Sequence, residues 1–540
     1  MVITGPPLAE RVPTEPATMP GRVVVQWDKE ALETVGLVKI DLLGLRMLSA
    51  ISEAVEIIYE TTGERVDLDH LTFDDPAVYD LIASADTIGV FQVESRAQSQ
   101  VLPRLQPRCF QDLIITISLI RPGPIQGDMV HPYLRRRQAL RPGSGQALRP
   151  GPGQDAEPVT YPHPCLESVL AETLGVILFQ EQVLKVAREL AGFTPGQGEM
   201  LRRALGHKRG EEAIQRLRDT FLEGAQQRGV PGAVAEEVFA RLQAFGGYSF
   251  PKSHAAAFAV LVYQSAWLKC YYPAAFYAAL LNNQPMGFWS PAVLVGDARR
   301  HAIRVLPVDI QRSRAKCVVA GDGIRLGLNY VKGLGAASIT RLEEARKTKA
   351  FGGLRDFCRR TRLPRRVVEN LILAGAMDGW TAARRTLLWE LGKLRYREEE
   401  LDLVLPDDGV ELLPLSQAEA IAAEYDLLGV FSSDHVMTLY RPWLARQGIL
   451  DSQELKTVPD GRWVRVAGWV VVHQAPPTAK GHHFITLEDE AGLIDVILRP
   501  QVYDRCRRIL HTVRLLLIEG RVQSKGGVIN VLAQKIAAIE

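Results

Sequence analysis

Three features that would narrow the class of protein are scarce in this 540-residue chain. The six cysteines are scattered and form no C-x-x-C pair, which argues against zinc fingers and disulfides and favours a reducing, cytoplasmic location. No uninterrupted apolar run reaches the roughly 18 residues of a membrane span, and residues 1–20 lack the regions of a signal peptide. The net charge is only +2. A nucleic-acid surface would therefore have to arise from local clusters of charge.

What is present is a composition typical of soluble globular proteins, with 47% hydrophobic and 23% charged residues. The length is sufficient for three or four domains, each with a core of its own.

An apolar segment near the N-terminus contains a single acid. Residues 36–46 read GLVKIDLLGLR, which predicts a strand over 37–43, a glycine turn and a helix over 45–59. A strand this apolar is usually buried on both faces, so the carboxylate of Asp41 is costly unless a metal or a cation meets it. From the residues alone, a satisfied core acid and a metal ligand both remain open.

Residues 67–280 are expected to be mostly helical, with an apolar helical stretch over 260–281 whose aromatic residues suit packing better than base stacking. Several segments stand out between the helices. They are TIGVFQVES (87–95), IRPGP (120–124), LFQEQ (178–182), LRRAL (201–205) and GGYSFPKSHA (246–255). Each one alone has an ordinary structural explanation, and only the set and its order are informative.

A Pro/Gly-rich insertion over 138–156 contains a near-perfect duplication, QALRPGSG followed by QALRPGPG. Such a segment cannot form a packed core and predicts a surface loop. Its arginines could touch DNA, but an expanded insertion without function is the favoured interpretation.

Residues 316–383 contain two candidate helix-hairpin-helix units. In the first, Lys332, Gly333 and Gly335 precede a helix expected at Ala336, where backbone N–H groups at the helix start could approach phosphate oxygens. The second, weaker unit includes Arg365 and Arg366. These residues predict a duplex contact without sequence preference, and the alternative is an ordinary helical hairpin with a solvated basic face.

After a charged helical connector over 384–458, the last part of the chain alternates as strands do. Three strands, a helix over 501–510 and two further strands are expected within 459–540. This is the order of an OB-fold, a frequent binder of single strands. Arg465 and Phe484 are candidates for charge and stacking on DNA, although a fold alone does not prove binding.

Taken together, these segments resemble bacterial C-family DNA polymerases of the DnaE type. The resemblance rests on GLVKIDLLGLR with Gln26-Trp27-Asp28 before it, and on the ordered segments of residues 87–255. Residues 121–137, 267–273, 284–291 and 297–301 are most similar to the error-prone branch. The resemblance implies an α+β multidomain fold. Its parts would be a partial palm of the Pol β-like nucleotidyltransferase type (1–66), helical fingers (67–315), tandem helix-hairpin-helix units (316–383), a connector (384–458) and an OB-fold barrel (459–540).

The resemblance also implies a reaction, the addition of dNTPs to a primer 3′-OH. Asp41 would be the third of three carboxylates that hold two Mg²⁺ ions, and so both a catalytic residue and a metal ligand. The resemblance assigns contacts with dNTP or DNA to a further set of residues. They are Arg121, Gln180, Arg202, Arg203, Lys252, Ser253 and His254.

One departure from the family concerns the front of the chain. Complete members begin with a PHP domain and a first half of the palm that carries two acids as D-x-D, whereas the only D-x-D here is Asp67-Leu68-Asp69, at a position that is a polar turn in the family. We therefore expect a C-terminal portion that is inactive alone. The expected partners are primer-template DNA, dNTPs, the N-terminal polymerase half, and mutasome proteins or a sliding clamp, but no membrane. The alternative function is a non-catalytic DNA-binding or scaffold protein.

Overall fold

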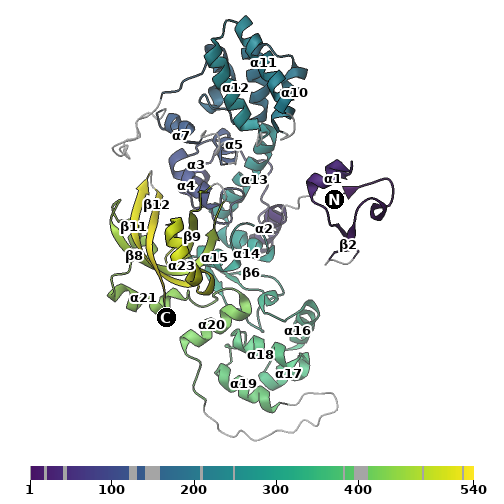
Figure 1. Cartoon of the computed structure of the whole chain (residues 1–540). Coiled ribbons are helices and arrows are strands. Elements are labelled where there is room, and N and C mark those ends of the chain that lie inside the picture. Colours follow the sequence, from purple (N-terminus) through teal and green to yellow (C-terminus); the bar gives the residue numbers. More distant parts are fainter. Residues whose placement is uncertain are drawn as a thin grey trace. The chain divides into compact units, whose positions relative to one another are not determined.

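The chain divides into two units, residues 1–49 and 50–540, and each is described by itself. The structure is a computed structural model (Figure 1). It describes residues 2–17, 21–40, 46–120, 130–139, 158–206, 211–246, 250–380, 383–394, 412–476, 479–525 and 528–539. Asp41, Arg121 and most of the Pro/Gly-rich insertion lie outside these residues.

The first unit is small and has a small core. Strand β1 (Val2–Ile3) pairs with β4 (Val38–Lys39), and β2 (Thr14–Pro16) pairs with β3 (Val23–Val25), followed by helix α1 (Lys29–Thr34). Its buried core consists of Val12, Leu32 and Leu37. The expected burial of an apolar strand on both faces is wrong for the described part, because Val38 is 59% exposed and Ile40 is also exposed. Two short strand pairs cannot cover both faces of the segment.

The expected helical region is confirmed in the second unit. Helix α2 (Arg46–Thr62) follows the apolar segment as predicted. The helices after it are α3 (Pro76–Ala83), α4 (Arg96–Leu105), α5 (Phe110–Leu119), α7 (Val130–Ala139), α8 (Glu167–Leu170), α9 (Gln180–Ala191), α10 (Pro195–Gly206), α11 (Glu211–Gln227) and α12 (Gly232–Gly246).

The expected apolar stretch over 260–281 is divided between two helices. Helix α13 spans Lys252–Tyr271 and α14 spans Pro273–Asn282. The break falls before Pro273, since proline has no N–H to continue a helix and disfavours helical backbone in the residue before it. Tyr263 and Tyr277 are both buried, which agrees with packing as the main role of these aromatic residues.

Helix α15 (Pro291–Arg300) leads to a small sheet of order β5-β7-β6, made of Arg304–Leu306, Gly323–Arg325 and Val318–Ala320. The next helices are α16 (Ala336–Thr348), α17 (Leu354–Thr361), α18 (Arg365–Leu373) and α19 (Arg384–Lys393). As predicted, α16 begins at Ala336 directly after Gly335. The connector contains α20 (Gln417–Leu428), α21 (Met437–Arg446) and α22 (Ser452–Leu455).

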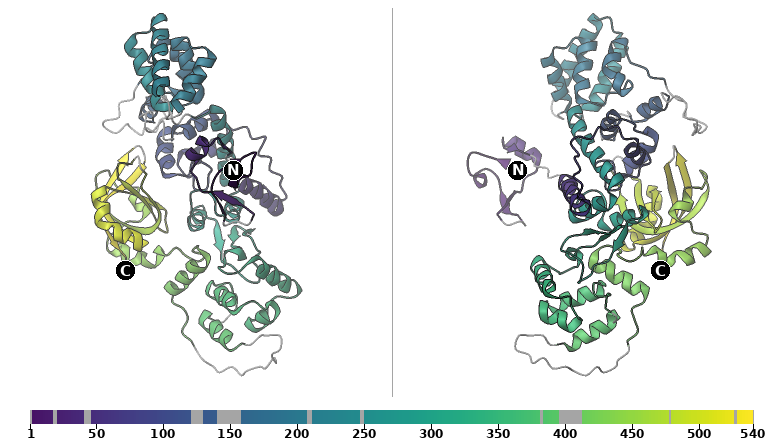
Figure 2. Two further views of the ribbon diagram at one scale, coloured as in Figure 1. Left: turned by 45° about the vertical axis from the view of Figure 1, so that its right-hand side comes forward. Right: turned by 180° about the vertical axis from the view of Figure 1, so that it is seen from behind.

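The chain's last strands form a closed barrel of order β10-β12-β11-β8-β9 (yellow in Figure 2). The strands are β8 (Trp463–Gln474), β9 (His483–Glu488), β10 (Leu493–Leu498), β11 (Leu515–Lys525) and β12 (Val528–Ala538), with α23 (Pro500–Thr512) between β10 and β11. This order of strands and helix is the one that the alternation of residues predicts, so the α+β multidomain fold is confirmed. Within the described residues, no helix has both the length and the apolar character that crossing a bilayer requires.

The exposed apolar residues of the first unit lead to a prediction about local stability. We expect the amides of Val38–Ile40 to exchange hydrogen quickly, because the unit buries few apolar side chains and its short strands leave most backbone groups in water. The amides of Val262–Leu268 in α13 should exchange slowly, near the rate set by global unfolding. Hydrogen exchange followed by mass spectrometry checks this. Equal protection of the two segments would show that the first unit is stable by itself.

Candidate nucleotide and nucleic-acid sites

The predicted triphosphate residues Lys252, Ser253 and His254 occupy the first turn of α13, beside the start of α9. The backbone N–H of Gln180 donates to the carbonyl oxygen of Phe250 at 2.9 Å, so the structure brings Gln180 next to this group. Ser253 and His254 are exposed. The ring of His254 lies 4.2 Å from that of Phe258, centroid to centroid. The site therefore combines a helix start, an amide and an aromatic surface.

Two carboxylates already bond to the backbone N–H and to the ammonium of Lys252. The backbone N–H of Lys252 donates to both carboxylate oxygens of Glu181 at 3.1 Å. The ammonium of Lys252 pairs with Glu172. Because Glu181 satisfies the start of the helix as an anion would, a phosphate group would have to replace it or bind beside it.

Arg202 and Arg203 lie on another helix, α10, and both pair with Glu199. Arg202 donates twice to this carboxylate, at 2.7 Å each, and Arg203 donates once, at 2.8 Å. These hydrogen bonds lower the pKa of Glu199 to about 2. The structure thus groups Arg202 with Arg203 around the carboxylate of Glu199. The prediction that they contact a triphosphate stays open.

A buried cluster that sequence reasoning missed lies between α13 and α15. The ammonium of Lys269, fully buried, donates to Asp86 at 2.8 Å and to Asp297 at 2.9 Å. His301 lies 2.6 Å from the other oxygen of Asp86, and the hydroxyl of Tyr277 donates to Asp297 at 2.6 Å. A lysine is rarely buried without partners, so Lys269 within the apolar sequence 267–273 was the signal that could have revealed this cluster.

The same cluster is the one group of side chains, among the described residues, that could hold a metal ion: Asp86, Asp297 and His301. The ammonium of Lys269 already bonds to both of its carboxylates. A metal ion bound by the same two carboxylates would lie beside the ammonium of Lys269, and the two positive charges would repel each other. The cluster therefore fits an internal cation, and it does not fit Mg²⁺.

The first helix-hairpin-helix unit has the backbone geometry that phosphate contact needs. Gly333 has a φ of +84°, a conformation that favours glycine, and Gly335 is the N-terminal cap of α16. Lys332 is exposed, and its carbonyl oxygen accepts a hydrogen bond from the side chain of Asn370 at 2.7 Å. Since Asn370 belongs to α18, this bond connects the two predicted units.

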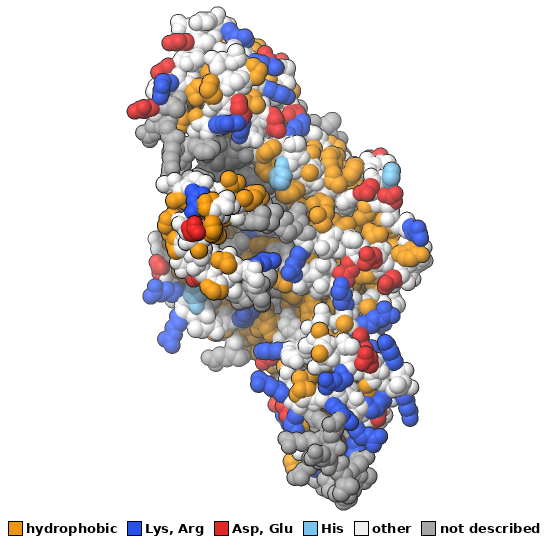
Figure 3. Space-filling view, turned by 90° about the vertical axis from the view of Figure 1, so that its right-hand side faces the viewer, with side chains coloured by type: hydrophobic (Ala, Val, Ile, Leu, Met, Phe, Trp, Pro, Cys, Tyr) orange, Lys and Arg blue, Asp and Glu red, His pale blue; other side chains and the backbone are white. Residues whose placement is uncertain are grey.

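In the second unit, Arg365 contacts the end of a neighbouring helix. It donates to the carbonyl oxygens of Leu391 and Leu394, at 2.9 and 3.0 Å, and so caps the C-terminus of α19. Arg366 is exposed at the start of α18. Figure 3 shows basic side chains outnumbering acidic ones over the lower part of this face, where the helix-hairpin-helix region lies. Of the two arginines, Arg366 is the better placed to meet DNA.

The two candidates on the barrel are engaged in contacts within the protein. The guanidinium of Arg96, on α4, lies 4.9 Å from the centroid of the Phe484 ring. Arg465 donates to the carbonyl oxygen of Gln447. Neither contact tests DNA binding, so both assignments stay predictions.

Comparison with known proteins agrees with this arrangement. Residues 1–44 match the family model of the bacterial DNA polymerase III alpha NTPase domain, and 47–229 match the finger domain of the same subunit. Residues 302–387 match a helix-hairpin-helix motif, and 464–539 match an OB-fold nucleic acid binding domain.

Curated relatives are similar along the whole chain. The error-prone DNA polymerase of Alkalilimnicola ehrlichii is 43% identical over 541 residues, covering 99% of this chain and 51% of the relative. That of Anaeromyxobacter dehalogenans is also 43% identical, covering 100% and 48%, and that of Bordetella bronchiseptica is 42% identical, covering 99% and 50%. The chain spans about half the length of these relatives. Among solved structures, asparaginyl-tRNA synthetase from Pyrococcus horikoshii is 23% identical over 17% of this chain and 23% of its own, with a TM-score of 0.15.

The buried cluster predicts how stability depends on pH. The hydrogen bond with Asp86 raises the pKa of His301 above its usual value, against the opposing effects of burial and of the Lys269 charge. A raised pKa means that the imidazolium stabilises the fold fully below about pH 6.5 and that this contribution is lost as the pH rises through the raised pKa. We therefore expect His301→Asn to lower the melting temperature more at pH 6 than at pH 9. At pH 6 the free energy of unfolding should fall by about 1.5–3 kcal/mol.

The matched control is His70→Asn. The His70–Asp67 pair is exposed, so its loss should change the melting temperature little at either pH. Thermal melts of both variants at the two pH values measure the effect. A loss in His301→Asn that is larger at pH 9 would contradict the charged state of His301 assigned here.

Proposed function

Because the chain belongs to the family of bacterial DNA polymerase III alpha subunits and is similar throughout to its error-prone members, we propose that it is part of an error-prone DNA polymerase. Such an enzyme adds dNTPs to a primer 3′-OH and releases pyrophosphate. The observation that carries the proposal is that the models of the DNA polymerase III alpha NTPase domain, its finger domain, a helix-hairpin-helix motif and an OB-fold match in this order along the chain.

Asp41 is the proposed catalytic residue and metal ligand. Asp41 would be one of several carboxylates that hold divalent ions for two-metal phosphoryl transfer; when bound, these ions would supply activation of the attacking oxygen and neutralisation of the leaving group. Asp67 and Asp69, the one D-x-D pair in the sequence, do not suit this role, because Asp67 is exposed and pairs with His70 at 2.8 Å. Further acids beside Asp41 would have to come from another polypeptide segment.

The start of α13 is the proposed site for the nucleotide's phosphates. Lys252, Ser253 and His254 offer an ammonium, a hydroxyl and an imidazole at a helix start, and Gln180 adds an amide. Polyanions favour such groups because charge-assisted hydrogen bonds are roughly twice as strong as neutral ones. Release of Lys252 from Glu172 and of its N–H from Glu181 would accompany binding. Arg121, Arg202 and Arg203 are proposed as further contacts of the nucleotide or the DNA.

The helix-hairpin-helix region is the proposed duplex-binding site. Lys332, Gly333 and Gly335 offer one cation and the backbone N–H groups at the start of α16, and Arg366 adds a second cation, with Arg365 beside it. These contacts read phosphates and not bases, so binding should be independent of sequence. A polymerase half that contains the remaining acids, mutasome proteins and a sliding clamp are proposed as protein partners.

Primer extension tests the catalytic proposal. We expect the 540-residue polypeptide alone to extend no primer with Mg²⁺ and dNTPs, because Asp41 by itself cannot hold two ions. Mixing it with a purified polypeptide that supplies the D-x-D half from a relative should give extension, and Asp41→Asn should abolish the extension. Gel analysis of a labelled primer is the measurement.

Two results would change this view. Robust extension by the chain alone that disappears in Asp41→Asn would show that its 540 residues assemble a complete metal site. No extension in any mixture, together with retained DNA binding, would favour the non-catalytic, DNA-binding alternative.

Salt dependence tests the duplex-binding proposal. The chain should bind primed DNA without sequence preference, and log K should fall linearly with log salt, by about 0.9 per duplex phosphate contacted. Lys332→Ala combined with Arg366→Ala should weaken binding and reduce the magnitude of this slope by about 2.

Arg241→Ala is the control, because Arg241 pairs with Glu237 on α12, in another part of the chain. Fluorescence anisotropy at several salt concentrations gives the slopes, and a slope that does not change in the double variant would argue against this site.

A further inference from the structure

The face on which OB-folds usually bind nucleic acid is covered in this barrel. That face belongs to the second and third strands, here β9 and β10. The outward side chains of β9 are buried, Thr486 at 3% exposed and Glu488 at 1%. Arg300 of α15 donates to Glu488 at 3.2 Å, and Gly296 of the same helix lies so close that an added Cβ would come within 2.5 Å of that carboxylate.

Arg96 covers the same two strands further along. It donates to the carbonyl oxygen of Val496 at 3.1 Å and to the side chain of Asn530 at 3.0 Å. Its guanidinium also lies over Phe484. A strand of DNA could therefore reach the β9–β10 face only after α4 and α15 had moved away from it.

The opposite part of the barrel surface, on β8, β11 and β12, carries the features that the covered face lacks. Trp463 of β8 is 48% exposed and lies directly across from Arg521 of β11, which is also exposed. One exposed tryptophan is ordinary by itself. Next to an arginine on the neighbouring strand, it forms a surface on which a base can stack while its phosphate meets a cation.

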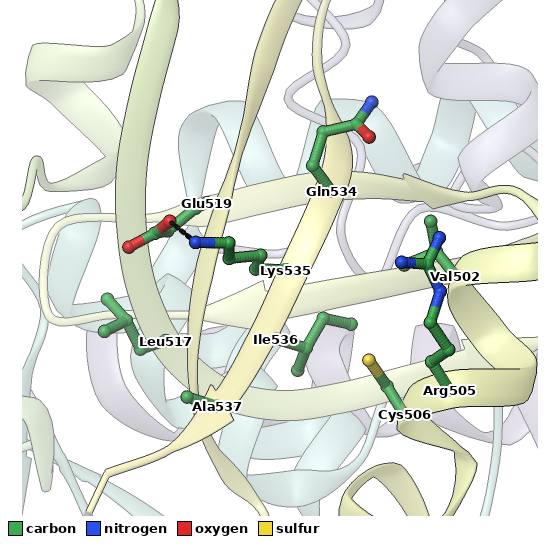
Figure 4. A pocket seen from close by; sticks show the side chains of 9 residues that line it. All are labelled: Val502, Arg505, Cys506, Leu517, Glu519, Gln534, Lys535, Ile536 and Ala537. Carbon is green, nitrogen blue, oxygen red and sulfur yellow. Dashed lines mark ion pairs between the residues drawn. The ribbon is translucent and has the colours of Figure 1, made fainter.

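A pocket of about 290 Å³ opens between α23 and the strands β11 and β12 (Figure 4). Its apolar lining includes Leu517, Ile536 and Cys506. Its polar lining groups are Arg505, Glu519, Gln534 and Lys535. This volume is at the lower end for ligand pockets, so it suits one flat ring better than a large cofactor.

A β-bulge shapes this pocket. Lys535 pairs with Glu519 and Ala533 pairs with Gly520, so Gln534 is an extra residue in β12. Bulges redirect side chains and are frequent beside functional sites. Glu519 forms an ion pair with Lys535 at 3.8 Å (Figure 4), and α23 adds the exposed Arg505, Arg507 and Arg508 against one acid, Asp504. Among the residues that line the pocket, two are cations, Arg505 and Lys535, and one is an acid, Glu519.

We propose that single-stranded DNA binds along β11 on this outer face, with one base stacked on Trp463 and a neighbouring base in the pocket. Glu519 and Arg521 are two residues apart on β11, about 7 Å along the strand, so the two positions are adjacent. Arg521 and Arg505 contact the phosphates. The inference rests on the proposed function and specifies which surface of the barrel carries out single-strand binding.

Binding of a fluorescent oligo(dT) to the full chain tests this assignment. Trp463→Ala should raise Kd about 5- to 150-fold, which corresponds to the roughly 1–3 kcal/mol of one base–aromatic stack. Arg521→Gln should lower the magnitude of the salt slope by about 0.7. Ala537→Trp, which fills the pocket, should also weaken binding. Trp389→Ala is the matched control, because Trp389 is 46% exposed on α19, a helix that packs on α17 and α18 and is not part of the barrel. This variant should bind oligo(dT) as the parent chain does.

Other outcomes would overturn the proposal. Unchanged Kd in Trp463→Ala and Ala537→Trp would reject this face and leave the pocket to a protein partner. A loss of affinity in Phe484→Ala, with normal binding in Trp463→Ala and an unchanged melting temperature, would return DNA to the β9–β10 face. Binding of primed duplex to the parent chain is measured in parallel. If the parent chain binds neither oligo(dT) nor duplex, the proposed function itself is rejected. If it binds duplex but not oligo(dT), only this inference is rejected.

Discussion

The buried ammonium of Lys269 is the interaction on which the centre of the second unit depends. It bonds to Asp86 before α4, to the carbonyl oxygen of Ile88 and to Asp297 on α15. Removing such charges from water costs several kcal/mol per ion, so each one requires the others in place. We therefore expect the cluster to favour the arrangement of α13, α15 and the segment around Asp86 that pairs all of these charges.

Arg300 connects this cluster of buried charges to the barrel. Arg300 follows Asp297 by three residues and bonds both to it, at 3.3 Å, and to Glu488, at 3.2 Å. Burial raises the pKa of Glu488 to about 7 in spite of this arginine. Gly296 makes the approach possible, because any side chain there would collide with the carboxylate. Helix α15, which bonds to Lys269 through Asp297, thus also covers one face of the barrel through Gly296 and Arg300.

Local patterns in the sequence predicted local structure well. The start of α16 followed from Gly333 and Gly335, and the barrel order followed from alternating residues, because both signals act over a few residues. The charged contacts could not be predicted in this way. His301 and Asp86 are 215 residues apart, and Arg96 and Val496 are 400 apart. Periodicity shows that a face is buried, but not which distant residue covers it. For that reason Phe484 suggested a stacking surface and was found under Arg96.

These constraints separate the surfaces that a nucleic acid can meet. The hairpin region presents backbone N–H groups and exposed cations, which under the proposed function would contact phosphates whatever the sequence. The start of α13 presents a lysine already paired with an acid, so the proposed binding of phosphates there would be an exchange of one anion for another. On the barrel, buried charges hold one face closed, and aromatic and basic side chains remain exposed on the other. Under the proposed function, the contacts with phosphates, with the triphosphate and with bases would therefore be made by three different elements: the hairpin region, the start of α13 and the barrel.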